Sequence, residues 1–383
     1  MAKQKLRRIS AGQFATMMTA AYTGLGIFYF PREAVSSAGR EGLYAFWLDG
    51  LIAFALMRLI FRTNRVAPNE TLSGFASSLL SKPVGYLIGV YTIVYHLALV
   101  IAATVLFSMV LGNVFLPSTP IWAIDGALTL TAITMAWSGA AALARTLQAS
   151  YIPLLVLTVL SISLAAVSIR HPTLLMPSGD ISILPILKGA YRQFLIFIGF
   201  QLSVTLYPFV REGDQKKAER YSYYALFGII LALTMQYEVI VGVFGPTMTS
   251  QLRWPLASAY RIISISGFYI SKLGTLLIVL WTIVVTAFVS VRLWCLAHDL
   301  SVFLKSFVSI RYTLGLIIMG GLAFWGEILF PNAQVTNIWT ERWLIPFGVG
   351  YLVGIPLLVL TVAAIRKEKT LHLKTMPEKG KEL

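Results

Sequence analysis

The sequence predicts an all-α integral membrane protein with about ten transmembrane helices, arranged as two five-helix halves. The chain of 383 residues is 57% hydrophobic and 12% charged, with a mean hydropathy of +0.76, values typical of membrane proteins. It divides into about ten apolar stretches close to the roughly 20 residues that cross a bilayer. The first and sixth stretches are interrupted at matching positions, which is typical of secondary transporters built from inverted repeats.

The spans follow from moving a 20-residue window along the chain. The boundary between the third and fourth span is the least marked, because residues 83 to 124 contain no Asp, Glu, Lys or Arg. The turn-forming sequence GNVFLPSTP at 112 to 120 divides them. The predicted spans are 9–36, 43–61, 83–112, 121–142, 147–169, 189–210, 221–245, 273–295, 312–330 and 343–365.

The basic residues predict the orientation of these spans. With the N-terminus in the cytoplasm, 22 of the 31 Lys and Arg residues fall on cytoplasmic segments and nine on outer segments, which satisfies the positive-inside rule for an even number of spans. We therefore expect a cytoplasmic N-terminus (1–8), a first five-helix repeat (9–169), a second five-helix repeat (189–365) and a cytoplasmic tail (366–383).

Several classes of protein are disfavoured by the composition. The net charge of +15 lies in short tracts between apolar runs, so it indicates contact with membrane lipid and not with nucleic acid. The single cysteine, Cys295, excludes an internal disulfide framework and a Cys-rich metal site, and we expect no cofactor. The apolar run after MAKQKLRR is too long for a signal-peptide core, so we expect this segment to be retained.

The interrupted spans are the functional signal. Span one contains Thr23-Gly24-Leu25-Gly26, and span six contains Gly199 near its middle and Pro208 near its inner end. Irregular backbone inside a bilayer occurs where it lines a cavity or is buried in protein. The alternative is that these glycines only permit close helix packing, but the match between the two halves favours a small-molecule site.

The sequence resembles the B-subunit permeases of endospore germinant receptors, the spore permease family within the amino acid-polyamine-organocation superfamily. The resemblance is carried by Ile9-Ser10 and Gln13, the Gly24-Leu25-Gly26 break, Pro31-Arg32-Glu33 and Ala38-Gly39-Arg40-Glu41. The segments LLSKPVGYLIGVYTIVY and LYPFVREGDQKKAERY are similar to that family's patterns as well. Tyr29-Phe30-Pro31 departs from the more usual Leu-Pro ending.

The resemblance implies a leucine-transporter-type fold of five helices repeated in inverted orientation, with a pocket between spans one, three, six and eight. It also implies nutrient sensing during spore germination, beside an A subunit and a lipoprotein C subunit in the spore inner membrane. The implied ligand is an amino acid, a sugar or a nucleoside.

In that implied pocket, we expect backbone groups of Thr23, Gly24, Leu25 and Gly26, together with Gly199, to hydrogen-bond the ligand. Phe200 would cover the ligand, although it is equally compatible with lipid or helix contact. Tyr91 and Tyr95 of span three share one face and are expected to line the pocket. The alternative is an interfacial aromatic belt, but Tyr95 is about 18 Å into the membrane, too deep for one. His96 is expected to be a hydrogen-bonded interior residue rather than a proton relay.

Hydroxyl and carboxyl groups supply candidates for ion or proton coupling. Thr282, Thr286 and Ser290 form a stripe on span eight; Thr282 is assigned to the substrate pocket and the other two to ion coupling, unless their hydroxyls bond carbonyls of their own helix. Glu238 of span seven and Asp49 of span two are the other coupling candidates, or else buried structural partners. Arg58 and Arg292 are expected to snorkel toward the cytoplasmic interface.

Three functions remain open at this stage. The first is a permease-like subunit that senses a nutrient, and the second is a transporter coupled to protons or sodium. The third is a membrane enzyme of acyltransferase type, which would need His96 or the His298-Asp299 pair. That pair has no accompanying nucleophile or metal ligand in the sequence and is expected to be solvated at a helix end, so we expect no enzyme.

Overall fold

The computed structural model describes residues 8–22, 24, 26–170, 172–175, 179, 181–262, 273–304, 312–326, 329–330 and 332–375. Within these ranges the regular secondary structure is helical, apart from one isolated β-bridge between Ile9 and Val210. The α-helices are α1 (Ala11–Ala20), α2 (Phe30–Ala38), α3 (Gly42–Asn64), α4 (Leu72–Leu79), α5 (Lys82–Val110), α6 (Ile121–Trp137), α7 (Ala140–Ala166), α8 (Ile183–Gln193), α9 (Ser203–Leu206), α10 (Gln215–Gln251), α11 (Pro255–Ile262), α12 (Leu273–Leu304), α13 (Tyr312–Gly326), α14 (Ala333–Trp339), α15 (Ile345–Val349) and α16 (Ile355–Thr375).

Within the described ranges, seven helical stretches are long and apolar enough to cross a membrane, and α6 and α13 are shorter apolar helices. The seven stretches are Phe30–Asn64, Lys82–Phe115, Ala140–Ala166, Ile183–Phe209, Gln215–Gln251, Ile278–Leu304 and Ala333–Arg366. These seven stretches, the shorter helices α6 and α13, and α1 together occupy the positions of the ten predicted spans. The first stretch joins the outer part of predicted span one to span two, because α2 passes into α3 through the short turn Gly39–Glu41.

Local chemistry explains where the first helices begin. Ser10 caps α1: its Oγ accepts from the Gln13 backbone N–H at 3.3 Å, while the Gln13 side chain accepts from the Ser10 backbone N–H at 3.0 Å. This reciprocal capping box satisfies two otherwise unpaired N–H groups. Pro31 stands in the first turn of α2, where its missing N–H costs nothing.

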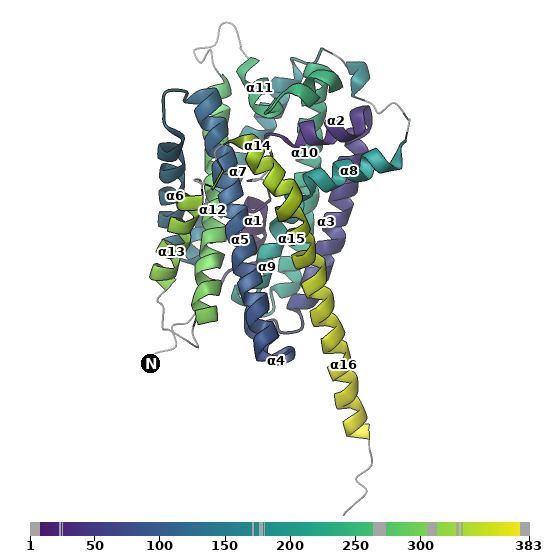
Figure 1. The fold of residues 1–383 in the computed structure, drawn as a ribbon, viewed down its shortest axis with the longest axis vertical. Helices are drawn as coiled ribbons and strands as arrows, with labels where there is room; N and C mark the ends of the chain where they lie inside the picture. The colour runs from purple at the N-terminus through teal and green to yellow at the C-terminus, as the bar shows by residue number, and fades with distance from the viewer. Residues whose placement is uncertain are drawn as a thin grey trace, which may run out of the picture.

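The long helices run roughly along one axis, and α1 lies within the bundle (Figure 1). It packs against α7, α10 and α12. Helices α2, α8 and α11 lie toward one end, and α4 and the projecting end of α16 lie toward the other. Helix α7 is the least buried of the long spans and exposes Ile152, Leu155 and Val156, so it forms part of the lipid-facing surface.

Helices α7 and α10 contain proline in their interior, beyond the first turn. Pro153 lies inside α7, and Pro246 lies inside α10 directly after Gly245, whose φ of 73° and ψ of 162° are not helical. The long axis of α10 therefore breaks at Gly245, and only the last turn, which carries Ser250, continues beyond it.

Candidate functional site

Span one is broken, as predicted. Helix α1 ends at Ala20, α2 begins at Phe30, and the described residues between them are turns and a bend. Gly26 has a φ of +92°, in the region that favours glycine, and its carbonyl accepts the Phe30 N–H at 2.8 Å. The predicted Thr23 and Leu25 lie outside the described residues. The Gly26 carbonyl thus takes the N–H groups of Tyr29 and Phe30, and the Ala21 carbonyl at the end of α1 is left for a partner outside the helix.

Span six also departs from α-helical geometry. Helix α8 passes into the 3-10 segment η4 (Phe194–Leu202), which is followed by the single-turn α9. Gly199 lies in η4, with its Cα against the backbone that directly follows α1. An added Cβ would be 2.7 Å from the Ala21 carbonyl carbon and 2.8 Å from the Tyr22 nitrogen. The two irregular segments therefore touch backbone to backbone. The small-molecule site expected at these glycines stays a prediction. Phe200, beside Gly199, is fully buried.

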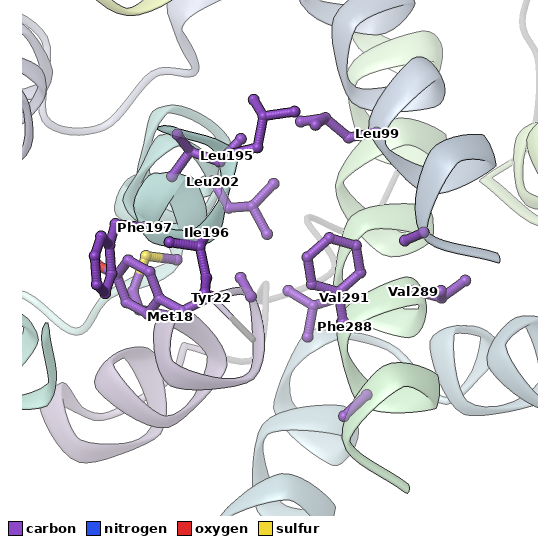
Figure 2. Packing of buried hydrophobic residues seen from close by; sticks show 14 of the residues in the cluster. Met18, Tyr22, Leu99, Leu195, Ile196, Phe197, Leu202, Phe288, Val289 and Val291 are labelled. Carbon is purple, nitrogen blue, oxygen red and sulfur yellow. The ribbon is translucent and has the colours of Figure 1, made fainter. Parts of the chain in front are cut away.

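Helix α12 supplies Phe288, which the sequence reasoning missed. An added Cβ at Gly24 would overlap the Phe288 ring, so this ring fills the space next to the break. Figure 2 shows Phe288 among buried apolar side chains from α1, η4, α5 and α12. The meeting point of the two broken spans is thus closed by an aromatic side chain.

Arg292 is one turn further along α12 and has 0% of its surface exposed. Its Nη2 donates to the Ala21 carbonyl at 3.2 Å, and its guanidinium lies 3.9 Å from the centre of the Phe288 ring. The expectation that Arg292 snorkels is wrong. Helix α12 continues to Leu304, so Arg292 lies about three turns from the end and not at the interface.

Tyr91 and Tyr95 face the last span. The Tyr91 hydroxyl donates to the Phe347 carbonyl at 2.7 Å, and their two rings stack at 3.9 Å. Tyr95 is fully buried beside Tyr351, with ring centres 5.0 Å apart. His96 is also fully buried, and neither of its nitrogens has a hydrogen-bond partner in the described structure. Tyr95 is thus deep, as predicted, whereas His96 lacks the hydrogen bond expected of it.

A polar cavity of about 400 Å³ lies at the end of the molecule where α2, α8, α14 and the end of α10 meet. We call it the vestibule. Tyr29 lies between it and the break, because an added Cβ at Gly26 would be 3.6 Å from the Tyr29 ring. Arg192 and Glu341 form an ion pair at 3.2 Å across the vestibule. Its charged or aromatic lining residues are Tyr29, Arg32, Glu33, Arg192, Arg253 and Glu341.

The opposite end is closed by contacts between segments distant in sequence. The Ile9 N–H donates to the Phe209 carbonyl at 2.8 Å, which joins the start of α1 to the end of span six. The Glu219 carboxylate accepts from the Tyr207 hydroxyl at 2.8 Å and forms a bidentate ion pair with Arg65. We call Arg65, Tyr207 and Glu219 the inner clasp. The clasp residues line a second cavity, of about 460 Å³, at this end.

The hydroxyls of the stripe on α12 bond carbonyls of their own helix, which is the alternative that the sequence left open. Thr282, Thr286 and Ser290 donate to the carbonyls of Ile278, Thr282 and Thr286 at 2.9, 2.7 and 2.6 Å. Their hydrogen atoms are therefore used within the helix. Among the described residues, no group of three or more His, Cys, Asp or Glu side chains could hold a metal ion.

The predicted carboxylates lie apart from the stripe, on other helices. Asp49 on α3 is 1% exposed, and its Oδ2 has no hydrogen-bond partner in the described structure. Glu238 on α10 is only half-buried. The His298-Asp299 pair is not solvated, contrary to expectation: Asp299 is 2% exposed and its Oδ2 accepts from Thr205 at 2.7 Å. The longer course of α12 again explains the difference.

Comparison with known proteins adds the family. A family model described as Spore germination protein matches residues 8–324. The chain is similar to spore germination protein B2 of Bacillus subtilis (strain 168), at 21% identity over 70% of this chain and 73% of that protein. It is also similar to spore germination protein GerLB of Bacillus cereus, at 21% identity over 94% of this chain and 95% of that protein.

Solved structures show the fold. A Na+-coupled sialic acid symporter in a substrate-bound outward-open state is similar with a TM-score of 0.65 at 11% identity, covering 91% of this chain and 79% of that one. The manganese transporter of Eremococcus coleocola is similar with a TM-score of 0.53 at 12% identity, covering 92% and 75%. The chain has the leucine-transporter-type fold of a multi-pass membrane protein, with broken helices one and six.

Proposed function

The chain belongs to the spore permease family of spore germination proteins, and on that basis we propose that it is the nutrient-sensing, permease-like subunit of an endospore germinant receptor. It acts in the spore inner membrane beside an A subunit and a lipoprotein C subunit, with both termini in the cytoplasm. Residues 9–169 and 189–365 are its two inverted repeats. It binds a nutrient and catalyses no reaction.

The observation that carries this proposal is the contact of Gly199 with the backbone of Ala21 and Tyr22. Two broken helices that meet at mid-depth place unpaired peptide groups at one point, which is how secondary transporters of this architecture hold a small polar ligand. Backbone groups of Thr23, Gly24, Leu25 and Gly26 form one side of the proposed pocket, and Gly199 and Phe200 the other. Tyr95 and Thr282 complete it, with Tyr91 bracing span three against the last span.

The ligand reaches the pocket from the vestibule, past Tyr29. Phe288 packs against Gly24, so its ring must turn aside for a ligand to bind there. A ligand that prefers the arrangement with the ring displaced shifts the conformational equilibrium, and the A and C subunits detect that shift. Asp49, Glu238, Thr286 and Ser290 remain the candidates for proton or ion coupling to this change.

The test is ligand binding by the purified chain. We expect at least one member of a panel of amino acids, sugars and nucleosides to bind in lipid nanodiscs, measured by calorimetry. Gly199→Leu and Gly24→Leu should lose that binding and still insert in the membrane, because the new side chains occupy the space where backbone meets ligand. Binding retained by both variants would falsify the placement of the pocket.

A coupled transporter is the second candidate, favoured by the similarity to a Na+-coupled symporter. Uptake into liposomes that contain only this chain separates the two functions. Binding without accumulation of the ligand supports sensing. Accumulation that follows an imposed sodium or proton gradient supports transport instead.

A further inference from the structure

Arg292 has fewer partners than a buried charge requires. It is 0% exposed, and its Nη2 makes a single hydrogen bond, to the Ala21 carbonyl. Its Nε and Nη1 atoms have no partner in the part of the chain that the structure describes. A guanidinium carries a full positive charge at every physiological pH, and removing it from water is costly unless an anion compensates.

The neighbouring residues do not supply that anion. None of the ion pairs formed between described residues involves Arg292. Asp299 lies on the same helix seven residues further on, about 10 Å away along the axis, and its Oδ2 accepts from Thr205. The hydroxyls of Thr286 and Ser290 donate to their own helix. Among the described residues, the positive charge at the break is therefore balanced by the carbonyl end of α1 and the face of the Phe288 ring, with no carboxylate paired to it.

The groups facing this charge can donate further hydrogen bonds. Tyr95 and His96 on α5 lie within electrostatic range of Arg292. Both are fully buried, and the Tyr95 hydroxyl and the two His96 nitrogens have no hydrogen-bond partner among the described residues. Phe288 covers one face of the guanidinium at 3.9 Å and excludes water from that side. The Tyr95 hydroxyl and the one N–H of a neutral His96 ring are thus unused donors near a fixed cation, which suits an acceptor with negative charge.

We propose that Arg292 is the anchor of an anion-binding site, and that it holds the carboxylate of the nutrient next to the broken first helix. The assignment of the anion to the nutrient rests on the proposed function; the anion site itself does not. The same chemistry is met by a chloride ion, which would then be a resident ion of the site. Displacement of Phe288 gives either anion access to Nε and Nη1.

The test compares ligands with and without the negative group. Each of the twenty common amino acids and its α-carboxamide are titrated against the purified chain in nanodiscs. We expect the carboxylate form to bind at least about tenfold more tightly, because charge-assisted hydrogen bonds are stronger than neutral ones. In Arg292→Gln the preference should fall to about onefold. Arg58→Gln, the same substitution at an exposed arginine of α3, should keep it.

A purely structural role for Arg292 would behave differently. The thermal midpoint of the unliganded protein is measured in chloride and in isethionate at equal ionic strength. A thermal midpoint that is higher in chloride than in isethionate for the wild type, but equal in both for Arg292→Gln, supports an anion site and identifies chloride as a resident ion. If Arg292→Gln does not fold, Arg292→Lys serves instead and should bind carboxylates more weakly than wild type but keep the preference, since lysine retains charge without the planar fork.

The outcomes separate the two proposals. If amino acids and their amides bind equally and chloride has no effect, the anion site is disproved while nutrient binding stands. If nothing in the panel binds but chloride stabilises the wild type through Arg292, the anion site stands and nutrient binding fails.

Discussion

Gly199 shows how much one missing side chain can decide. Its neighbours across the helix contact are the backbone atoms of Ala21 and Tyr22, which cannot rotate away as a side chain can. Gly24 faces the Phe288 ring instead, which has rotamers available. The two glycines are equally prominent in the sequence, but they differ in what a substitution would meet.

Gly199→Ala is therefore expected to destabilise the protein by about 1–3 kcal/mol, because a methyl group there forces the two broken helices apart. Gly228 on α10 is the matched control, since an added Cβ there meets nothing within 4 Å. Gly228→Ala should leave stability unchanged or raise it by up to about 1 kcal/mol. Unfolding in detergent, followed by circular dichroism, measures both. Equal effects of the two changes would contradict the close backbone contact.

Gly24→Ala should be rescued by a smaller partner. The added methyl group collides with the Phe288 ring, so Gly24→Ala alone is expected to destabilise, whereas in a Phe288→Leu background its cost should fall by about 1 kcal/mol or more. A double-mutant cycle on thermal unfolding gives this coupling. Strictly additive effects would mean that residues 24 and 288 are not in contact.

At the scale of the elements, the inner clasp joins three of them. Glu219 of α10 binds Arg65, directly after α3, and Tyr207, at the inner end of span six. The carboxylate is buried while Arg65 is exposed, so the pair is anchored on the α10 side. The clasp closes the end of the molecule opposite the vestibule.

Glu219→Gln is expected to loosen this end. Replacing the buried carboxylate weakens three charge-assisted hydrogen bonds, two from Arg65 and one from Tyr207, and should cost about 1–3 kcal/mol. The control is Glu212→Gln, which removes the partner of Arg8 in an exposed pair and should cost less than about 1 kcal/mol. Hydrogen exchange of residues 203–210 reports the change; protection that is the same in both variants would show that the clasp does not hold span six.

The helices themselves were largely predictable, and their ends were not. Hydropathy located the spans, whereas the capping box at Ser10 and the place of Pro31 in the first turn of α2 are seen only in the structure. The end of α12 was placed at 295 because the sequence becomes more polar there, yet the helix continues to Leu304. Burial against other helices makes Arg292 and Asp299 interior residues, and hydropathy cannot detect that tertiary contact.

At the scale of the whole molecule, the vestibule and the inner clasp lie at opposite ends of the bundle. Helices α2 and α8, which line the vestibule, are at one end, and α4 and the end of α16 are at the other (Figure 1). The count of basic residues predicts that the clasp end faces the cytoplasm. Charge bias orients a chain but gives no shape, so the vestibule itself could not be predicted from the sequence.

Thiol labelling tests this orientation on a clean background, because the only cysteine, Cys295, is fully buried. We expect Ser36→Cys, in the vestibule, to react with a membrane-impermeant maleimide in intact cells. Glu212→Cys should react only after the membrane is permeabilised, and the wild-type chain should remain unlabelled. The reverse order of labelling would mean that the chain is inserted the other way round.

The break in α10 at Gly245 divides the helix into two parts with different surroundings. Pro246 offers no N–H to the preceding turn, and Gly245 has left helical geometry, so the segment after the break takes its own direction. Thr249 holds that segment to the break, because its Oγ1 donates to the Gly245 carbonyl at 2.7 Å. One helix thus contributes Tyr237 to the core and, past its break, Ser250 to the mouth of the protein.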